Sequence, residues 1–219
     1  MTSNTLVRSD WREGRRRTAR ATIVEAAWAL VREAGLAGLS MRDLAARAGI
    51  TTPTIYAYFE SKNDIYDAMF GDAAAEFEAR MAAPYDTEDS AAVLVAGTLR
   101  FVQFCTEDVA RYQLLFQRTI PDFEPSEESY AHAVMALEGT KRRLATVGVT
   151  DPKHVDLWTA LTTGLVDQQV SNDPGGDRWA RLVEDAVAMF LSHCQIHVEN
   201  APRASLTPRR SPTRKGARR

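Results

Sequence analysis

Residues 40–59, SMRDLAARAGITTPTIYAYF, place two short helix patterns on either side of a sharp turn, and this stretch limits the possible folds more than any other. Ser40 precedes an apolar-periodic run and has an acidic residue three positions later, a spacing typical of a capping box. Gly49 stands where a helix end needs a residue that tolerates positive φ. Thr51 can cap a second helix, and Pro53 fits its first turn. The pattern predicts a helix-turn-helix, whose second helix fits the major groove of DNA.

The second helix of this unit has two unlike edges. Ile55 and Phe59 form an apolar edge that suits burial in a core. The opposite edge is polar and aromatic, and no acidic residue follows it before Glu60. Its members are Thr52, Thr54, Tyr56 and Tyr58. An edge of this kind can approach a polyanion without charge repulsion.

A wider resemblance connects these motifs. An apolar helix pattern with Ile23, Ala27 and Leu30 is followed by Gly35, by SMRDLAARAGI and by TTPTIYAYFESKNDIY. The combination of A-x-x-A-G-I with Y-x-Y-F-x-S-K resembles the DNA-binding domain of the tetracycline-repressor (TetR) family of bacterial regulators. The rest of the chain resembles the family only in length and helical character, as expected of a ligand domain that varies between members.

The resemblance implies which residues contact DNA. In the family, the N-cap of the recognition helix, its first turn and the two tyrosines touch the duplex. Carried onto this chain, Thr51 binds a phosphate at the helix N-terminus. Thr52, Pro53 and Thr54 face base edges. Further contacts, to phosphates or to a groove edge, are expected from Arg16, Arg17, Ser40, Met41, Arg42, Tyr56, Tyr58 and Lys62, with Arg15 and Arg20 also within reach of the backbone or the minor groove.

The expected recognition helix departs from the usual chemistry of base readout. It has no Arg, Lys, Asn or Gln before Phe59, so the common bidentate contacts to bases are missing. Arg42, on the preceding helix, is the best candidate for a direct base contact. We therefore expect readout through thymine methyl groups, water and DNA shape. Plainer roles remain open, because Tyr56 could be structural and the arginines at 15–17 could form a solvated helix entry.

Charge is distributed unevenly along the chain. Residues 1–62 hold ten Lys and Arg against six Asp and Glu, residues 63–199 hold ten against twenty-three, and residues 200–219 hold seven against none. A basic head and an acidic body suggest that the head meets the polyanion. The basic tail is expected to be a solubilising segment, with nonspecific DNA affinity that falls as salt rises as its other possible role.

The chain is expected to be all-α, with a three-helix DNA-binding unit and a C-terminal helical bundle for effector binding and dimerisation. The expected divisions are a flexible basic arm at 1–16, the DNA-binding domain at 17–77, the ligand-binding and dimerisation domain at 78–198, and a disordered basic tail at 199–219. The periodic segments predict helices at about 17–34, 62–82, 87–105, 107–118, 126–147, 152–170 and 177–197.

Aromatic residues are frequent in the expected bundle, and in a regulator of this kind they resemble the lining of an effector pocket. The candidates are Phe101, Phe104, Cys105, Tyr112, Phe116, Trp158 and Leu161, although for each residue taken singly an ordinary core role is the better interpretation. Lys and Arg are sparse between 80 and 140, which favours a small, largely apolar effector. The segment WTALTTG resembles a Trp-x4-His-Gly signature of some family members, but Thr163 stands where His is expected.

Several other classes of function find little support in the sequence. Two cysteines form no disulfide framework and suit a reducing cytosol, and the longest apolar run, AAVLVAG, is far shorter than the ~20 residues of a membrane span. We therefore expect a cytoplasmic bacterial protein. His193 and His197 have a chelating spacing, but two ligands at a helix end are too few, and interface histidines are the better interpretation. No cofactor, metal site or catalytic residue is expected, and Cys105 fits an inert core thiol better than a redox sensor.

These observations favour a homodimeric repressor that a small effector releases from a near-palindromic operator. The resemblance implies that segments 152–170 and 177–197 pair with those of a second copy. One alternative is a constitutive DNA-binding module whose bundle serves a protein partner. Another is a helical enzyme with a regulator-like head, for which the sequence offers no converging pair of titratable residues.

Overall fold

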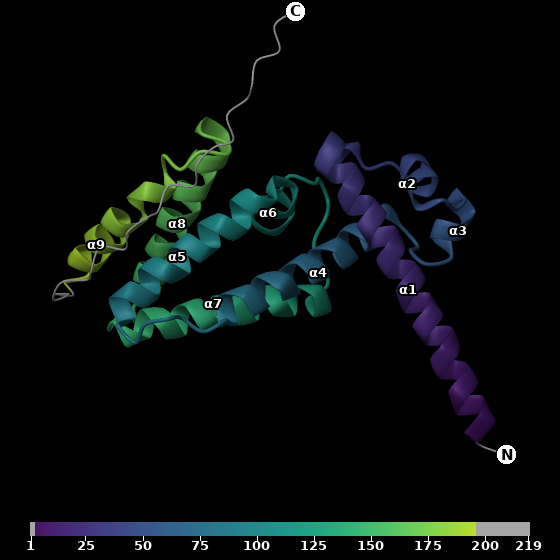
Figure 1. Cartoon of the computed structure of the whole chain (residues 1–219), viewed down its shortest axis with the longest axis horizontal. Coiled ribbons are helices and arrows are strands. Elements are labelled where there is room, and N and C mark those ends of the chain that lie inside the picture. Colours follow the sequence, from purple (N-terminus) through teal and green to yellow (C-terminus); the bar gives the residue numbers. More distant parts are fainter. Residues whose placement is uncertain (1–2, 196–219) are drawn as a thin grey trace, which may run out of the picture.

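The structure is a computed structural model that describes the backbone of residues 3–195 and the side chains of residues 13–195. Every regular element in these ranges is helical, which confirms the predicted all-α class (Figure 1). The elements are α1 (Ser3–Ala34), η1 (Leu36–Gly38), α2 (Met41–Ala48), α3 (Thr52–Tyr56), α4 (Lys62–Ala82), α5 (Ser90–Glu107), α6 (Val109–Phe116), α7 (Glu127–Thr146), α8 (Pro152–Asn172), η2 (Ala180–Leu182) and α9 (Val183–His193).

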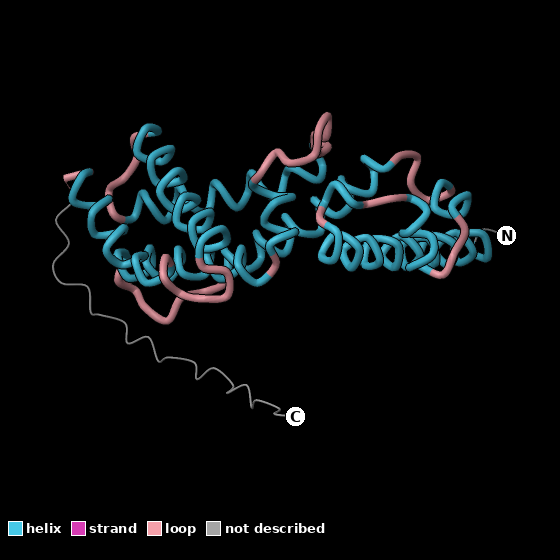
Figure 2. The backbone as a smooth tube through the Cα atoms, turned by 90° about the horizontal axis from the view of Figure 1, so that it is seen from above, coloured by secondary structure: helices cyan, strands magenta, loops and turns pink. Residues whose placement is uncertain are grey.

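Two hydrophobic cores divide the chain into a head and a bundle. The head core joins α1, α2, α3 and the first turns of α4, with Ile23, Leu44 and Ile65 almost completely buried. The bundle core joins α5, α6, α8 and α9 with Leu144 of α7, and Phe104 and Phe190 are almost completely buried in it. The head and the bundle lie at opposite ends of the molecule (Figures 1 and 2).

Helix α4 connects the two cores, because it begins in the head and packs along α7 in the bundle (Figure 1). It starts at Lys62 as the sequence predicts. The Ser61 hydroxyl accepts from the backbone N–H of Asp64 at 3.1 Å, while the Asp64 carboxylate accepts from the Ser61 N–H, which completes a capping box. The carboxylate of Asp67 accepts from the backbone N–H of Ser126, at 2.7 Å, and thereby joins α4 to the start of α7.

Two helix boundaries differ from the sequence predictions. The first helix was expected from about residue 17, but α1 begins at Ser3. The last helix was expected from about residue 177, but the chain forms η2 first and α9 begins only at Val183. The buried side-chain oxygen of Gln169 accepts from the backbone N–H groups of Trp179 and Ala180, at 2.9 and 3.2 Å, so α8 supplies the partners for this entry turn. The expected end of the last helix, residues 196 and 197, lies outside the described residues.

Candidate functional site

The helix-turn-helix forms with the predicted caps. The Ser40 hydroxyl oxygen accepts from the Asp43 N–H at 3.1 Å, and Gly49 ends α2 with a φ of 69°. Thr51 caps α3 by accepting from the Thr54 N–H at 3.4 Å. The hydroxyl groups of these two threonines also share a hydrogen bond of 2.8 Å. The two short helices are therefore capped on either side of the turn, as the sequence predicts.

Helix α3 buries its apolar edge and exposes its polar one. Ile55 is completely buried and Phe59 is 1% exposed, both in the head core. Tyr56 is 50% exposed, and Pro53 also faces solvent. The side chains on this edge that are half-buried are Thr52, Thr54 and Tyr58. The N-terminus of α3, capped by the exposed Thr51, opens onto the same surface.

The other candidate DNA contacts surround α3 at different depths. Arg16, Arg17 and Arg42 are exposed, whereas Ser40 and Met41 are half-buried at the start of α2. Lys62 is half-buried at the start of α4, with its ammonium 5.4 Å from the centre of the Tyr66 ring.

Arg20 has a structural role that the sequence did not indicate. Its guanidinium lies 4.1 Å from the centre of the Phe59 ring and donates a hydrogen bond to the carbonyl of Tyr58. These contacts tie α1 to the segment that follows α3. Arg20 therefore positions the candidate recognition surface from behind, while Arg16 and Arg17 remain exposed on the same helix.

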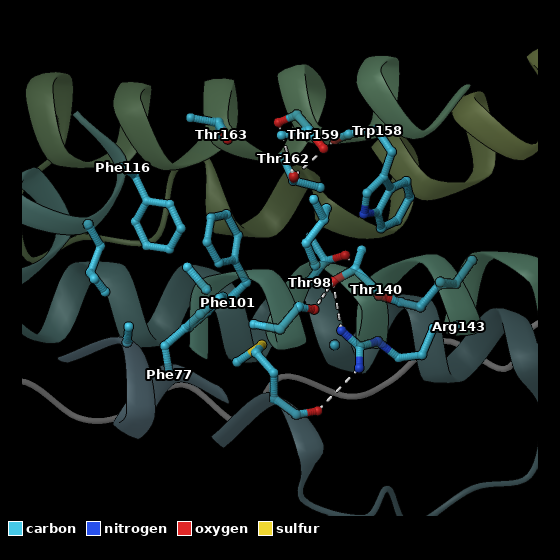
Figure 3. Close-up of a pocket in the computed structure, with 18 residues that line it drawn as sticks. Phe77, Thr98, Phe101, Phe116, Thr140, Arg143, Trp158, Thr159, Thr162 and Thr163 are labelled. Carbon is cyan, nitrogen blue, oxygen red and sulfur yellow. Dashed lines mark hydrogen bonds between the residues drawn. The ribbon is translucent and has the colours of Figure 1, made fainter. Parts of the chain in front are cut away.

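A cavity of about 160 Å³ lies in the bundle between α4, α5, α6, α7 and α8 (Figure 3). At one end the rings of Phe77, Phe101 and Phe116 meet, with centroids 5.2 to 5.9 Å apart and planes tilted edge to face. Trp158 forms part of the α8 wall at the other end. The volume is similar to that of an engineered apolar cavity of ~150 Å³ that admits benzene.

The predicted pocket residues separate into two groups. Phe101, Phe116 and Trp158 line the cavity. Four others lie outside its lining: Phe104, Cys105 and Tyr112 are completely buried in the bundle core, and Leu161 is half-buried against it. Three of the seven residues predicted from the sequence therefore line the cavity. Burial raises the pKa of the Cys105 thiol well above its usual range, as expected of an unreactive core cysteine.

The cavity also has a polar end that the sequence pattern did not reveal. Arg143, on α7, donates to the Thr140 hydroxyl at 2.9 Å and to the carbonyl of Met81 at 3.3 Å (Figure 3). Additional threonines on the cavity wall are Thr98 on α5 and Thr159, Thr162 and Thr163 on α8. Basic residues are sparse between 80 and 140, but Arg143 lies just beyond this range and lines the cavity.

Helix α6 contacts both the head and the cavity. Ala110 and Leu114 pack in the head core, whereas Leu115 and Phe116 line the cavity. Asp108, the N-cap of α6, forms an ion pair with Arg32 of α1 at 2.7 Å. A change in the shape of the cavity can therefore reach the head through this short helix.

Arg111 joins α6 to the neighbouring helices. Its side chain is largely buried and pairs with Glu76 of α4 at 2.6 Å. It also donates to the carbonyl of Phe104 on α5 at 3.2 Å and lies 4.0 Å above the ring of that residue. These contacts join α6, α4 and α5 at one point.

In the described part of the chain, no three His, Cys, Asp or Glu residues converge to hold a metal ion. The His193 ring meets the His154 ring at 5.9 Å, and His197 lies outside the described residues. Among the helices of residues 3–195, none is long and apolar enough to cross a membrane.

Comparison with known proteins identifies the head. Residues 23–69 match the family model for bacterial regulatory proteins of the tetR family. No curated protein sequence matches the chain. A tetR-family transcriptional regulator from Streptomyces coelicolor shares the fold with a TM-score of 0.64 and 21% identity, covering 80% of each chain.

Two further solved structures share the fold and contain small molecules. A TetR variant from Acinetobacter baumannii AYE, in complex with minocycline, gives a TM-score of 0.55 at 23% identity, over 80% of this chain and 95% of its own. FadR from Bacillus subtilis, in complex with stearoyl-CoA, gives a TM-score of 0.64 at 17% identity, over 78% of this chain and 97% of its own. At these identities the likeness shows a shared fold.

Proposed function

Because the head is a TetR-family DNA-binding domain, as in bacterial transcriptional regulators, we propose that this chain is a homodimeric repressor that a small molecule releases from a near-palindromic operator. The observation that carries the proposal is the exposed polar edge of α3, held in place by two capped helices. The cavity in the bundle supports the second half of the proposal, since the solved relatives with minocycline and stearoyl-CoA share this fold.

In the proposed complex, α3 enters the major groove. Thr51 and the N-terminus of α3 bind a phosphate, while Pro53 and Thr54 face base edges. Arg42 reaches a base from the first turn of α2. The remaining positions support the backbone contacts that fix the register: Arg16, Arg17, Ser40, Met41, Tyr56, Tyr58 and Lys62. Thr52, the first residue of α3, faces base edges together with Pro53 and Thr54.

The proposed dimer forms through α8 and α9. These helices leave Leu157 and Met189 42% and 61% exposed, and Leu182 of η2 is 40% exposed. Apolar side chains on two adjacent helices favour a four-helix interface with the same helices of a second copy. Two recognition helices would then lie about one DNA turn apart, ~34 Å, and read two half-sites.

The proposed release of DNA uses α4 and α6. A ligand in the cavity contacts Phe77 of α4 and Phe116 of α6, and both helices hold the head through packing and through the Arg32–Asp108 ion pair. A ligand that prefers a different spacing of these helices shifts the population away from the DNA-bound form. To move the protein from mostly DNA-bound to mostly free, the ligand must bind the free form more tightly than the DNA-bound form by roughly 3–5 kcal/mol.

Sedimentation velocity of the full chain, alone and with a DNA duplex, tests the proposed assembly. The proposal predicts a dimer at micromolar concentration and two chains on each operator duplex. A chain that remains monomeric in both samples contradicts the homodimer. The cavity favours the repressor over the constitutive DNA-binding module, which has no need of an internal space lined by side chains from five helices.

A further inference from the structure

Arg143 is a cation without a counter-charge at the wall of an otherwise apolar cavity. Its guanidinium is half-buried, and no carboxylate of the described residues lies within 4.0 Å of it. Of the five N–H groups of a guanidinium, two donate within the protein, to Met81 and Thr140. Burial of this group lowers its pKa; the nearby Tyr85 acts in the opposite direction, while Arg100 and Arg142 lower the pKa because each repels the charged form.

The neighbouring arginines have other partners. Arg100 donates to the carbonyls of Ala83 and Pro84, at 2.7 and 3.0 Å, and stacks on the Tyr85 ring at 4.0 Å. Arg142 is exposed to solvent and lies outside the cavity lining. Both therefore add positive potential near the cavity, but only Arg143 presents N–H groups to it.

Four of the five threonines that line the cavity offer oxygen lone pairs more readily than protons. The hydroxyls of Thr98, Thr140, Thr159 and Thr162 each donate to a backbone carbonyl one helical turn earlier, at 2.8 to 3.1 Å. Their hydrogens are thus already engaged. Compared with these four hydroxyls, Arg143 is the group that can donate to an anionic ligand.

We propose that the effector is a small amphipathic carboxylic acid, whose carboxylate pairs with Arg143 and whose apolar body lies against Phe77, Phe101 and Phe116. The two ends of the cavity in Figure 3 have these two chemistries, with the three rings at one end and Arg143 with Thr140 at the other. A planar guanidinium matches a carboxylate in a bidentate geometry. A partly buried cation gains most from a ligand that supplies the missing charge.

This inference rests on the proposed effector function and refines the expectation of a largely apolar effector. The volume of about 160 Å³ sets the size of the apolar body, which is close to one aromatic ring or a short branched chain. The effector class is therefore a small aromatic or short-chain acid.

Matched acids and amides test the charge preference directly. Phenylacetate and phenylacetamide, and hexanoate and hexanamide, have nearly the same shape and differ in charge. Isothermal titration calorimetry on the full-length protein is expected to show acids binding at least about tenfold more tightly than their amides, since a hydrogen bond to a charged group is worth more than a neutral one. Equal affinity, or tighter binding of the amides, overturns the inference.

Substitutions test whether Arg143 is the source of the preference for acids over amides. Arg143→Met keeps an apolar side chain of similar reach and is expected to remove the preference for acids, whereas Arg142→Met removes the same charge one residue away and is expected to keep it. Circular dichroism checks that both variants fold. If Arg143→Met fails to fold, Arg143→Lys is measured instead, and a loss of most of the preference is expected because lysine lacks the bidentate geometry. An unchanged preference in the folded Arg143 variant overturns the inference.

A parallel measurement of DNA binding distinguishes a failure of the carboxylate inference from a failure of the proposed regulatory function. If an amide binds in the cavity and releases DNA while no acid binds, the regulator stands and the carboxylate inference fails. If acids bind through Arg143 but the protein retains no specific DNA, the inference stands and the proposed regulator fails. If none of the four probes binds, the carboxylate inference fails, and retention of DNA is still read independently.

Discussion

Tyr112→Phe tests the contact that fixes α6 against α8. Tyr112 is completely buried, and its phenol donates to the carboxylate of Asp167 at 2.5 Å. The substitution keeps the ring and removes only this hydrogen bond. A bond to a charged acceptor contributes about 1.5–3 kcal/mol. Asp167 keeps a second donor, Gln117, at 2.9 Å, so the lower part of that range applies.

We expect the free energy of unfolding to fall by about 1.5–2 kcal/mol at pH 7.5, measured by urea denaturation followed by circular dichroism, with no change in the m-value. Tyr130→Phe is the matched control, because Tyr130 is 51% exposed, and it should change stability by less than about 0.5 kcal/mol. A loss below about 0.5 kcal/mol in Tyr112→Phe would refute the reasoning.

The same variant should change the response to alkaline pH. Burial, together with the hydrogen bond to Asp167, raises the pKa of Tyr112 above its ordinary value of about 10, and burial raises the pKa of Tyr66 to about 12. The fold thus favours the neutral phenols. Their contribution to stability is complete below about pH 10 and is lost as pH rises through the folded pKa, at about 1.4 kcal/mol per pH unit for each tyrosine. Tyr112→Phe removes one of these two tyrosines, so its stability should fall less steeply above pH 10; equal slopes would contradict this assignment.

The remaining predictions concern a cap, DNA contacts and the cavity. Ser61→Ala removes the cap of α4 and should lower the free energy of unfolding by about 1 kcal/mol in urea denaturation; an unchanged midpoint would show that the capping box contributes nothing. Lys62→Ala should weaken binding to all duplexes alike in fluorescence anisotropy and reduce the salt slope by about 1, whereas a loss confined to one sequence would assign Lys62 to base readout. Thr54→Ala should change the preferred sequence in a selection from random duplexes, and an unchanged profile would mean that α3 reads DNA with another edge. Ala136→Leu should fill the cavity and abolish binding of phenylacetate in calorimetry while DNA binding persists, and undiminished binding would place the ligand elsewhere.

Local features of the head were predictable because each depends on a few adjacent residues. The caps at Ser40, Thr51 and Ser61 and the left-handed Gly49 form from their own neighbours in sequence. The 62–82 helix followed from its cap and its apolar spacing. The early start of α1 was missed because the residues before Arg17 show no apolar period, which is the signal used to recognise a helix.

Features that depend on packing could not be read from local patterns. The backbone N–H of Trp179, in the turn that leads to α9, donates to the side chain of Gln169 on α8, ten residues earlier. No side chain caps α9 itself, so no residue next to the helix marks its start in the sequence. Phe104 and Phe116 are both aromatic residues on helices of the bundle, yet one fills the core and the other borders a cavity. Arg143 reaches the cavity only because α7 packs along α4, a contact between distant segments.

Selection of bound fragments from the genomic DNA of the source organism, with the full-length protein at near-physiological salt, tests the central claim most directly. A dimeric sequence-specific regulator should recover one near-palindrome whose half-sites lie about one helical turn apart. The genes beside it would indicate the chemistry of the effector. Recovery of bulk DNA without a shared motif would mean that the basic head binds only phosphates, and it would contradict sequence-specific regulation.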